Sequence, residues 1–271
     1  MRPLTARALA RIGLGALFVV RTTALANLLP VPLAHVRGPL LGWPAPGFAL
    51  AWGGLVLPTS VQTAFCVVRT IAAGCFMLGV RARVSGLVAG ACGFVALSQD
   101  PLAFVFTLYV LFAATMVMAL TDATTRLGLV PDRPTAGGAD DEESSTQLLV
   151  WFVASIYAYS AVAKLQAEWL SGRTLLALAE DGLVDGFFAP LILAHPSLRA
   201  AAAIGVFLVE LALPPLLIMR RTRRTAILAA LALHTWFELV THPDVMGFVM
   251  ATLLLSCSSR AAPATASAAS D

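Results

Sequence analysis

The chain has 271 residues, of which 59% are hydrophobic and only 12% are charged. Soluble domains are about 45–50% apolar and about 25% charged, so this composition excludes an ordinary water-soluble enzyme. The net charge of +3 is dispersed along the chain without a dense basic face, which excludes nucleic acid as a partner. The 4 cysteines lie in apolar runs without a CxxC pair, so they predict neither a disulfide framework nor a metal site.

Long apolar runs follow one another along almost the whole sequence. A helix needs about 20 apolar residues to cross the hydrocarbon, because lipid offers no partner for open backbone groups. Eight runs approach this length, and they predict an all-α, polytopic helix bundle in a membrane. The predicted spans are residues 7–27, 60–80, 84–99, 101–120, 147–168, 198–219, 225–241 and 244–258.

The segments between these runs predict how the chain is divided. Arg21 interrupts the first run and no cleavage site follows it, so we expect a retained helix and no cleaved signal. Residues 28–57 are rich in proline and tryptophan and predict a loop or re-entrant cap at the outer surface. Residues 121–146 are polar and acidic, and we expect a mobile cytoplasmic linker between halves 1–120 and 147–258, with residues 259–271 as a disordered tail.

Basic residues predict the orientation, because short loops rich in lysine and arginine stay in the cytoplasm. With the amino terminus inside, 12 of the 18 basic residues fall in cytoplasmic segments and only 3 in outer loops. The densest group is the run from Arg220 to Arg224. This pattern predicts both termini in the cytoplasm and a multi-pass protein of the plasma membrane, which in a bacterium is the inner membrane.

Apart from Glu168 and Asp244 at span ends and the arginines already counted with the loops, six Arg, Lys, His, Asp or Glu side chains lie inside predicted spans. A charge near the bilayer centre costs about 2.5–3.5 kcal/mol on insertion scales, so each is expected to face the bundle interior and find a partner. One interpretation is that they form ion pairs holding helices together, with Arg69 paired to Glu210 because both lie near mid-depth. The six are Arg21, Arg69, Lys164, Glu210, His234 and Glu238.

Lys164 is the single lysine of a chain that uses 17 arginines. Lysine can release its proton when removed from water, whereas arginine effectively cannot, so Lys164 is the usable amine base or nucleophile. As a base it should point into a cavity reached from the outer leaflet. The alternative is snorkelling, because Lys164 lies near the outer end of its span, and its tail then points to water.

His234 and Glu238 are four residues apart and share one helix face, where the carboxylate can orient the imidazole. Glu238 and Lys164 both fall toward the outer leaflet, so a pocket is expected there. The alternative for His234 is a hydrogen bond that packs two helices together.

Three segments of the sequence resemble one family. Leu9–Gly15 is similar to the arginine and glycine pattern that opens its first helix. Tyr157–Gly172 resembles a tyrosine-bearing helix that leads to Lys-Leu, an acidic residue, Trp and Gly. Glu210, His234 and Met246–Phe248 follow in the family's order around a basic loop. This is the horizontally transferred transmembrane (HTTM) family, which includes the vitamin K-dependent gamma-carboxylase.

The resemblance implies one HTTM-like transmembrane domain over residues 1–258, with Lys164 at the position of the family's proposed base. The implied activity is carboxylase-like: the lysine deprotonates a quinol cofactor of the vitamin K type, and the substrate is a secreted peptide or small molecule at the outer leaflet. A histidine of the carboxylase branch is replaced here by Gln99-Asp100. No metal is implied, and the predicted site comprises catalytic Lys164, His234, Glu210 and Glu238 with cofactor-binding Arg69, Tyr159 and Trp169.

Two other functions remain open at this point. The chain can be a non-catalytic membrane partner in the maturation, export or immunity of a secreted peptide, as the resemblance to small relatives implies, with its outer loops as the contact surface. A transporter is the least favoured interpretation, because Pro214-Pro215 interrupts one span without a counterpart in the first half.

The orientation makes a direct prediction for the acidic linker. A cysteine introduced as Gly137→Cys should resist a membrane-impermeant maleimide in intact cells and react after permeabilisation, because the linker is cytoplasmic. Asp181→Cys, in a predicted outer loop, is the control that should react in both cases. Labelling of Gly137→Cys in intact cells would contradict the predicted orientation.

Overall fold

The computed structural model describes residues 3–22, 57–99, 106–121, 127–130, 139–241 and 245–258. In these ranges the protein is helical, as predicted, with one isolated bridge between Val80 and Val130. The predicted loop at 28–57, apart from Leu57, and the tail at 259–271 lie outside the described residues. The helices are α1 (Pro3–Thr22), α2 (Thr59–Leu78), α3 (Ala82–Gln99), α4 (Phe106–Ala119), α5 (Ala139–Ala163), α6 (Ala167–Leu170), α7 (Arg173–Glu180), α8 (Ala189–Ala194), α9 (Pro196–Ile218), α10 (Arg223–Val240) and α11 (Val245–Cys257).

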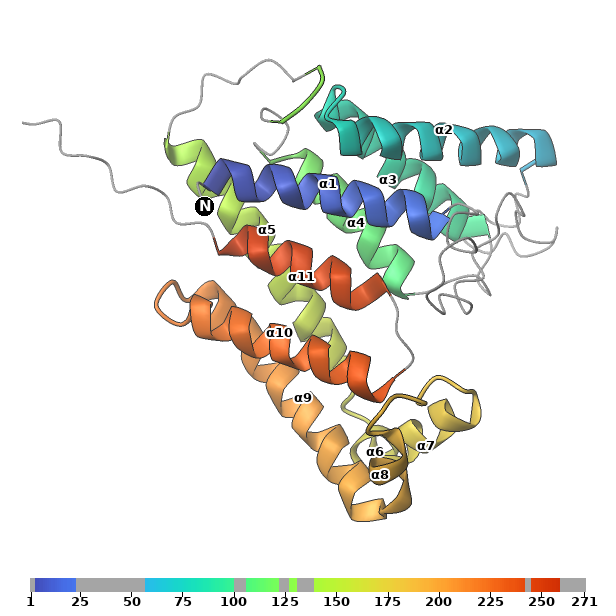
Figure 1. Ribbon diagram of the computed structural model, residues 1–271, viewed down its shortest axis with the longest axis vertical. Coiled ribbons are helices and arrows are strands. Elements are labelled where there is room, and N and C mark those ends of the chain that lie inside the picture. Colours follow the sequence, from blue (N-terminus) through green and yellow to red (C-terminus); the bar gives the residue numbers. More distant parts are fainter. Residues whose placement is uncertain are drawn as a thin grey trace, which may run out of the picture.

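The long helices form two packed groups (Figure 1). In the first, α2 packs against α1 and α3, and α3 packs against α4. In the second, α9 packs against α5 and α10, and α10 packs against α11. The groups meet where the last helix, α11, lies along the first, α1. The short helices α6, α7 and α8 lie together at one end of the second group (Figure 1).

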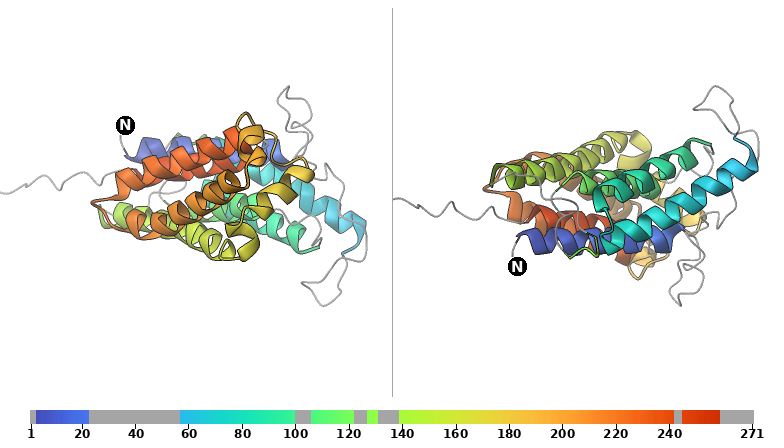
Figure 2. Two further views of the ribbon diagram at one scale, coloured as in Figure 1. Left: turned by 90° about the horizontal axis from the view of Figure 1, so that it is seen from below. Right: turned by 90° about the horizontal axis from the view of Figure 1, so that it is seen from above.

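The long helices run along roughly one direction, and the start of α1 and the end of α11 lie at the same end of the bundle (Figure 2). The start of α5 and the turn between α9 and α10 lie at that end as well, joined by an ion pair of 2.5 Å between Arg220 Nη2 and Glu143 Oε1. An even number of membrane crossings between the start of α1 and the end of α11 would place them at one end, and the cytoplasmic orientation stays a prediction.

Two helices in the described ranges are long and apolar enough to cross a membrane, the stretches Glu143–Ala163 of α5 and Pro196–Ile218 of α9. Four shorter apolar helices accompany them: Thr63–Leu78, Ala82–Val95, Phe106–Ala119 and Val245–Cys257. The helical class and a membrane location are supported, while the number of eight spans stays a prediction. The predicted span 147–168 also ends earlier than expected, because α5 stops at Ala163 and the backbone at Gln166 is extended.

The predicted linker is more ordered than its composition indicates. Ala139–Thr146 belongs to α5, and residues 127–130 are bonded to the turn between α2 and α3. Leu129 N donates to Leu78 O at 3.0 Å, and Arg11 Nη2 donates to Leu127 O at 2.7 Å. Gly79 has a φ of 70° and lies so close to Gly128 that a Cβ at Gly79 would overlap its Cα. The absence of side chains at Gly79 and Gly128 therefore lets the two backbone segments pack directly against each other.

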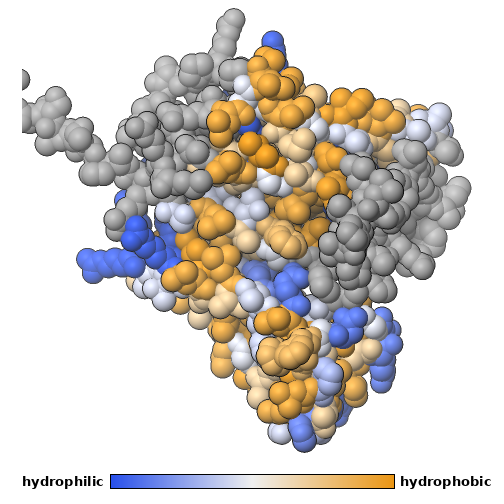
Figure 3. Space-filling view, in the orientation of Figure 1, coloured by the Kyte–Doolittle hydropathy of each residue, from blue (hydrophilic) through white to orange (hydrophobic). Residues whose placement is uncertain are grey.

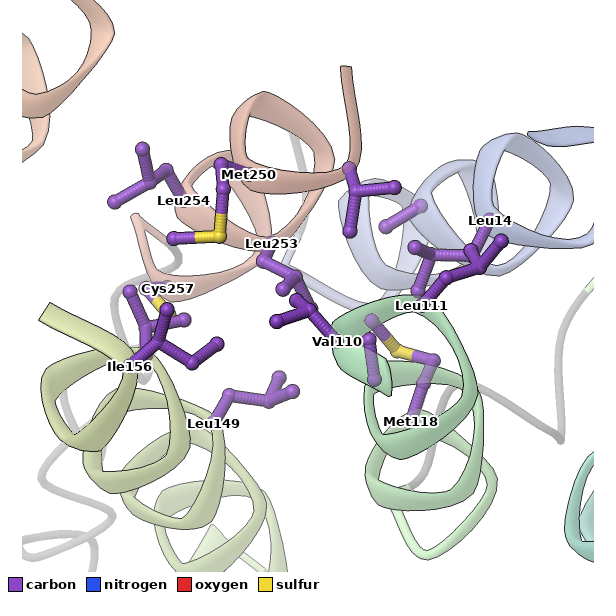
Figure 4. Packing of buried hydrophobic residues seen from close by; sticks show 14 of the residues in the cluster. Leu14, Val110, Leu111, Met118, Leu149, Ile156, Met250, Leu253, Leu254 and Cys257 are labelled. Carbon is purple, nitrogen blue, oxygen red and sulfur yellow. The ribbon is translucent and has the colours of Figure 1, made fainter. Parts of the chain in front are cut away.

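A hydrophobic core joins the two helix groups (Figure 4). Leu14 of α1 and Leu111 of α4 lie near Leu149 of α5 and Leu253 of α11, and all four are fully buried. The side chains come from both ends of the sequence, so this core can form only after both groups are in place. Lipid tails are as apolar as these side chains, so close packing between the helices, rather than removal of apolar surface from water, favours one bundle over two separate ones.

Close backbone packing in the first group leads to a prediction. A Cβ at Gly15 would lie 2.6 Å from Met77 Cβ and 2.7 Å from Met77 Cα, so α1 and α2 have no room for a methyl group there. Gly15→Ala should lower the free energy of unfolding by about 1–3 kcal/mol through overpacking. It is measured by thermal and denaturant unfolding of the purified protein in detergent.

Gly74→Ala in α2 is the matched control, because nothing lies within 4 Å of a Cβ at Gly74. A mid-helix glycine is about 0.8–1.0 kcal/mol less favourable than alanine, so this change should stabilise the protein. Equal effects of the two substitutions would show that α1 and α2 are not packed as described.

Candidate functional site

Lys164 forms a buried ion pair with Glu210 at the junction of α5 and α9. The distance from Lys164 Nζ to Glu210 Oε2 is 2.7 Å, and the side chains are 15% and 4% exposed. Lys164 Nζ also donates to Ser160 Oγ at 2.5 Å and lies 5.0 Å from the centre of the Trp169 ring. Lys164 follows the last residue of α5, so its side chain turns back along its own helix toward α9.

A second polar pair lies beside the first. The Tyr157 hydroxyl and His234 Nε2 are 3.0 Å apart and hydrogen-bonded, joining α5 to α10, and both residues are buried. Tyr157 lies two helical turns before Lys164 on the same face, so the two pairs belong to one environment. We refer to Tyr157, Ser160, Lys164, Glu210 and His234 as the polar cluster. It places hydroxyl, ammonium, carboxylate and imidazole groups together where three helices meet.

The sequence at the end of α5 explains three of the five residues of the polar cluster. Tyr157, Ser160 and Lys164 are spaced by three and four residues, which puts them on one face of the helix. Lys164 was predicted as a site residue, but Tyr157 and Ser160 were not. Their positions seven and four residues before Lys164 put them on its helix face, so they could have been found from the sequence.

Trp169 is held close to the polar cluster, and its predicted role in cofactor binding stays a prediction. Its Nε1 donates to the Ala203 carbonyl of α9 at 3.1 Å, which ties α6 to α9. The ring then lies over the Lys164 ammonium, an arrangement typical of a cation–π contact. Trp169 therefore covers the polar cluster rather than leaving it open.

Arg69 does not belong to this site, and the predicted pair with Glu210 is wrong. Arg69 Nη2 donates to the Thr22 carbonyl at the end of α1 at 3.3 Å, and its helix α2 packs in the first group with α1 and α3. Both residues were placed near mid-depth from the sequence, but a common depth does not bring two helices side by side. Lys164 takes the position beside Glu210 instead.

His234 has a partner on another helix, because the Tyr157 hydroxyl is hydrogen-bonded to its Nε2, and its orientation by Glu238 stays a prediction. The half-buried Glu238 side chain turns toward α11, where its Oε1 occupies the space a Cβ at Gly247 would take. The second interpretation, a packing hydrogen bond for His234, fits this arrangement. Tyr157 and His234 join two helices rather than one turn of α10.

Tyr159 lies away from the polar cluster. Its ring is 65% exposed and stacks on Phe106 of α4 at 5.9 Å. The two rings line a groove of about 440 Å³ between α4 and α5. The groove is lined by Phe106, Tyr109, Val110, Phe152, Ser155, Ile156 and Tyr159.

The aromatic groove and the lysine do not form one quinol site. Flat rings along the groove suit an apolar ring, but Lys164, Glu210 and His234 are not among its lining residues. A base must reach the hydroxyl it deprotonates to within about 2.6–3.2 Å, directly or through one water. The residues therefore do not fit a quinol held in this groove beside Lys164. In the described part of the chain, no three His, Cys, Asp or Glu side chains are grouped to hold a metal ion.

These features define an all-α membrane protein with a closed polar cluster between its two clearest spans. A profile of the HTTM domain matches residues 6–260. The match covers nearly the whole chain, so the protein belongs to the HTTM family and the resemblance seen in the sequence is confirmed. No curated protein and no solved structure matches the chain.

The Tyr157–His234 bond yields a prediction. Tyr157→Phe removes the hydroxyl and leaves the buried His234 nitrogen without its partner, which should lower the free energy of unfolding by about 1–3 kcal/mol. Tyr159→Phe is the matched control on the same helix, where an exposed hydroxyl is lost and the change should stay within about 0.5 kcal/mol. Unfolding in detergent measures both, and a larger effect at Tyr159 would refute the assignment of the pair.

Proposed function

We propose that this HTTM protein is a non-catalytic membrane partner in the maturation, export or immunity of a secreted peptide. In this role the polar cluster is structural, and its bonds hold α5, α9 and α10 in fixed positions relative to one another. The observation that carries the proposal is the closed state of Lys164, whose ammonium meets a carboxylate and a hydroxyl and is covered by an indole ring. The plasma membrane is the proposed location, in agreement with the family and its apolar spans.

A closed ion pair supports a structural role for a physical reason. A base needs the lone pair of a neutral amine and a place for the substrate proton, and two of the three possible donors of the Lys164 ammonium already face Glu210 and Ser160. Removing one member of a buried pair leaves an uncompensated charge at a cost of about 3–5 kcal/mol. Any catalytic use of the amine has to begin by opening this pair.

Carboxylase-like catalysis is the second candidate, and two observations favour it. The chain's single lysine lies in the polar cluster, and Tyr157 and His234 supply further proton donors and acceptors nearby. In this hypothesis Lys164 is the base, Glu210 balances its charge, and His234 and Glu238 orient groups at the outer leaflet. Tyr159, Trp169 and Arg69 would serve the cofactor and a carboxylate-bearing substrate, although Arg69 and Tyr159 lie outside the polar cluster. A quinol of the vitamin K type is the cofactor of this hypothesis.

Four variants distinguish the two functions: Lys164→Ala, Lys164→Arg, Glu210→Gln, and the charge swap Lys164→Glu with Glu210→Lys. If the pair is structural, Lys164→Ala should lower the free energy of unfolding by about 3–5 kcal/mol. Lys164→Arg should lower it much less, and the charge swap should restore much of what Lys164→Ala loses. Thermal unfolding in detergent measures these changes. The swap is the sharpest variant, since it restores the pair but moves the amine to another helix.

The same variants are assayed in proteoliposomes with a reduced naphthoquinol, oxygen and bicarbonate. The proposal expects no quinol oxidation above protein-free vesicles. Quinol oxidation by the native protein that Lys164→Arg lacks would overturn it in favour of the enzyme. If the swap variant is as unstable as Lys164→Ala, the pair does not have the proposed structural role.

A further inference from the structure

The two clearest spans are joined by a short folded segment, residues 164–195, which we call the cap. It contains α6, α7 and α8 and connects the end of α5 to the start of α9. Consecutive spans cross a bilayer in opposite senses, so the segment between them lies at one membrane surface. Connectivity alone therefore places the cap at the interface between water and lipid.

The cap has its own small core and is fixed to the bundle. Val184, Ala189 and Ile192 are buried against Val240 at the end of α10. The Phe188 ring stacks on Trp236 of α10 at 5.8 Å. Backbone bonds from Gly186 N to Val240 O, 3.1 Å, and from Phe188 N to Leu239 O, 3.0 Å, hold the same contact. The cap therefore presents its outer side chains in fixed positions.

Some large apolar side chains of the cap are exposed and do not belong to its small core. Leu183, Phe187 and Leu191 are 40%, 81% and 58% exposed, and we call them the apolar rim. Phe188, next to Phe187, turns inward, so the exposure of Phe187 is not a failure of the cap to fold. Figure 3 shows apolar and hydrophilic residues side by side over this lower part of the molecule.

Charged residues are also exposed on the cap, and one of them, Asp185, lies between Leu183 and Phe187 in the sequence. In α7, Leu175 is buried and Leu178 packs on the cap core, while Arg173 and Glu180 are exposed together with Leu176, which is 39% exposed. Asp181 follows in an exposed turn. An apolar edge beside a charged face is the pattern of elements that lie in the plane of a membrane surface.

We propose that the apolar rim is an interfacial anchor that enters the boundary between headgroups and acyl chains, while Arg173, Glu180 and Asp181 stay in water. The occupant of the rim is lipid because the cap directly joins two membrane spans and aromatic side chains are enriched at this depth. This anchor would fix the end of α9 that carries Ala203, to which Trp169 of α6 is bonded. The inference does not depend on whether Lys164 is catalytic.

Spin labelling of the whole protein in liposomes tests the anchor. Nitroxides are attached at Phe187→Cys, Leu191→Cys and, as the matched control, Asp181→Cys, in a background where the 4 native cysteines are changed to alanine. Accessibility is measured to oxygen, which concentrates in lipid, and to a water-soluble nickel chelate. Melting curves in detergent establish that each labelled variant is folded before its accessibility is interpreted.

An interfacial anchor predicts an oxygen-to-nickel accessibility ratio several-fold higher at positions 187 and 191 than at 181. Equal ratios at all three sites would place the rim in water and overturn the proposal. Labels at 187 and 191 shielded from both reagents would also overturn it, because the rim would then be covered by protein, either a second copy or a peptide partner.

Discussion

The ion pair between Lys164 and Glu210 is the interaction on which the second helix group depends. It joins the end of α5 to the middle of α9, and through Tyr157 and His234 the same environment reaches α10. Lipid gives no partner to a buried charge, so two helices that each carry one are forced to meet at this point. The packing of the three helices therefore follows from two residues of opposite sign, and the apolar contacts around them add strength without setting the register.

The two helix groups are closed by contacts of a different kind. Leu14 and Leu253 bring the first and last helices into one core, and Arg7 of α1 donates a buried hydrogen bond to Thr146 of α5. The protein thus combines apolar packing with a buried polar bond where the groups meet. This combination suits a bundle in lipid, where nonpolar contacts alone discriminate poorly between neighbours.

Much of the architecture could be predicted from the sequence, because apolar run length and charge placement act locally along the chain. The helices at α1 to α5 and α9 to α11 were predicted, and Lys164 and Glu210 were recognised as costly charges that need partners. The partners themselves could not be predicted. Depth along a span suggested Arg69 for Glu210, but lateral neighbours depend on how all helices pack, and α2 lies in the other group. Tyr159 was predicted as a site residue, whereas Tyr157 is the one in the polar cluster. Residues two positions apart on a helix point about 200° apart, and the sequence alone does not say which of them faces the interior.

The prolines inside α9 give the ion pair an additional mechanical role. Pro214 and Pro215 have no backbone N–H, so the carbonyls of Glu210 and Leu211 lack their usual donors four residues ahead. The carboxylate that meets Lys164 therefore belongs to the very turn where α9 is least stiffened by its own backbone. The ion pair to Lys164 therefore restrains this turn from outside the helix and limits bending of α9 at the prolines.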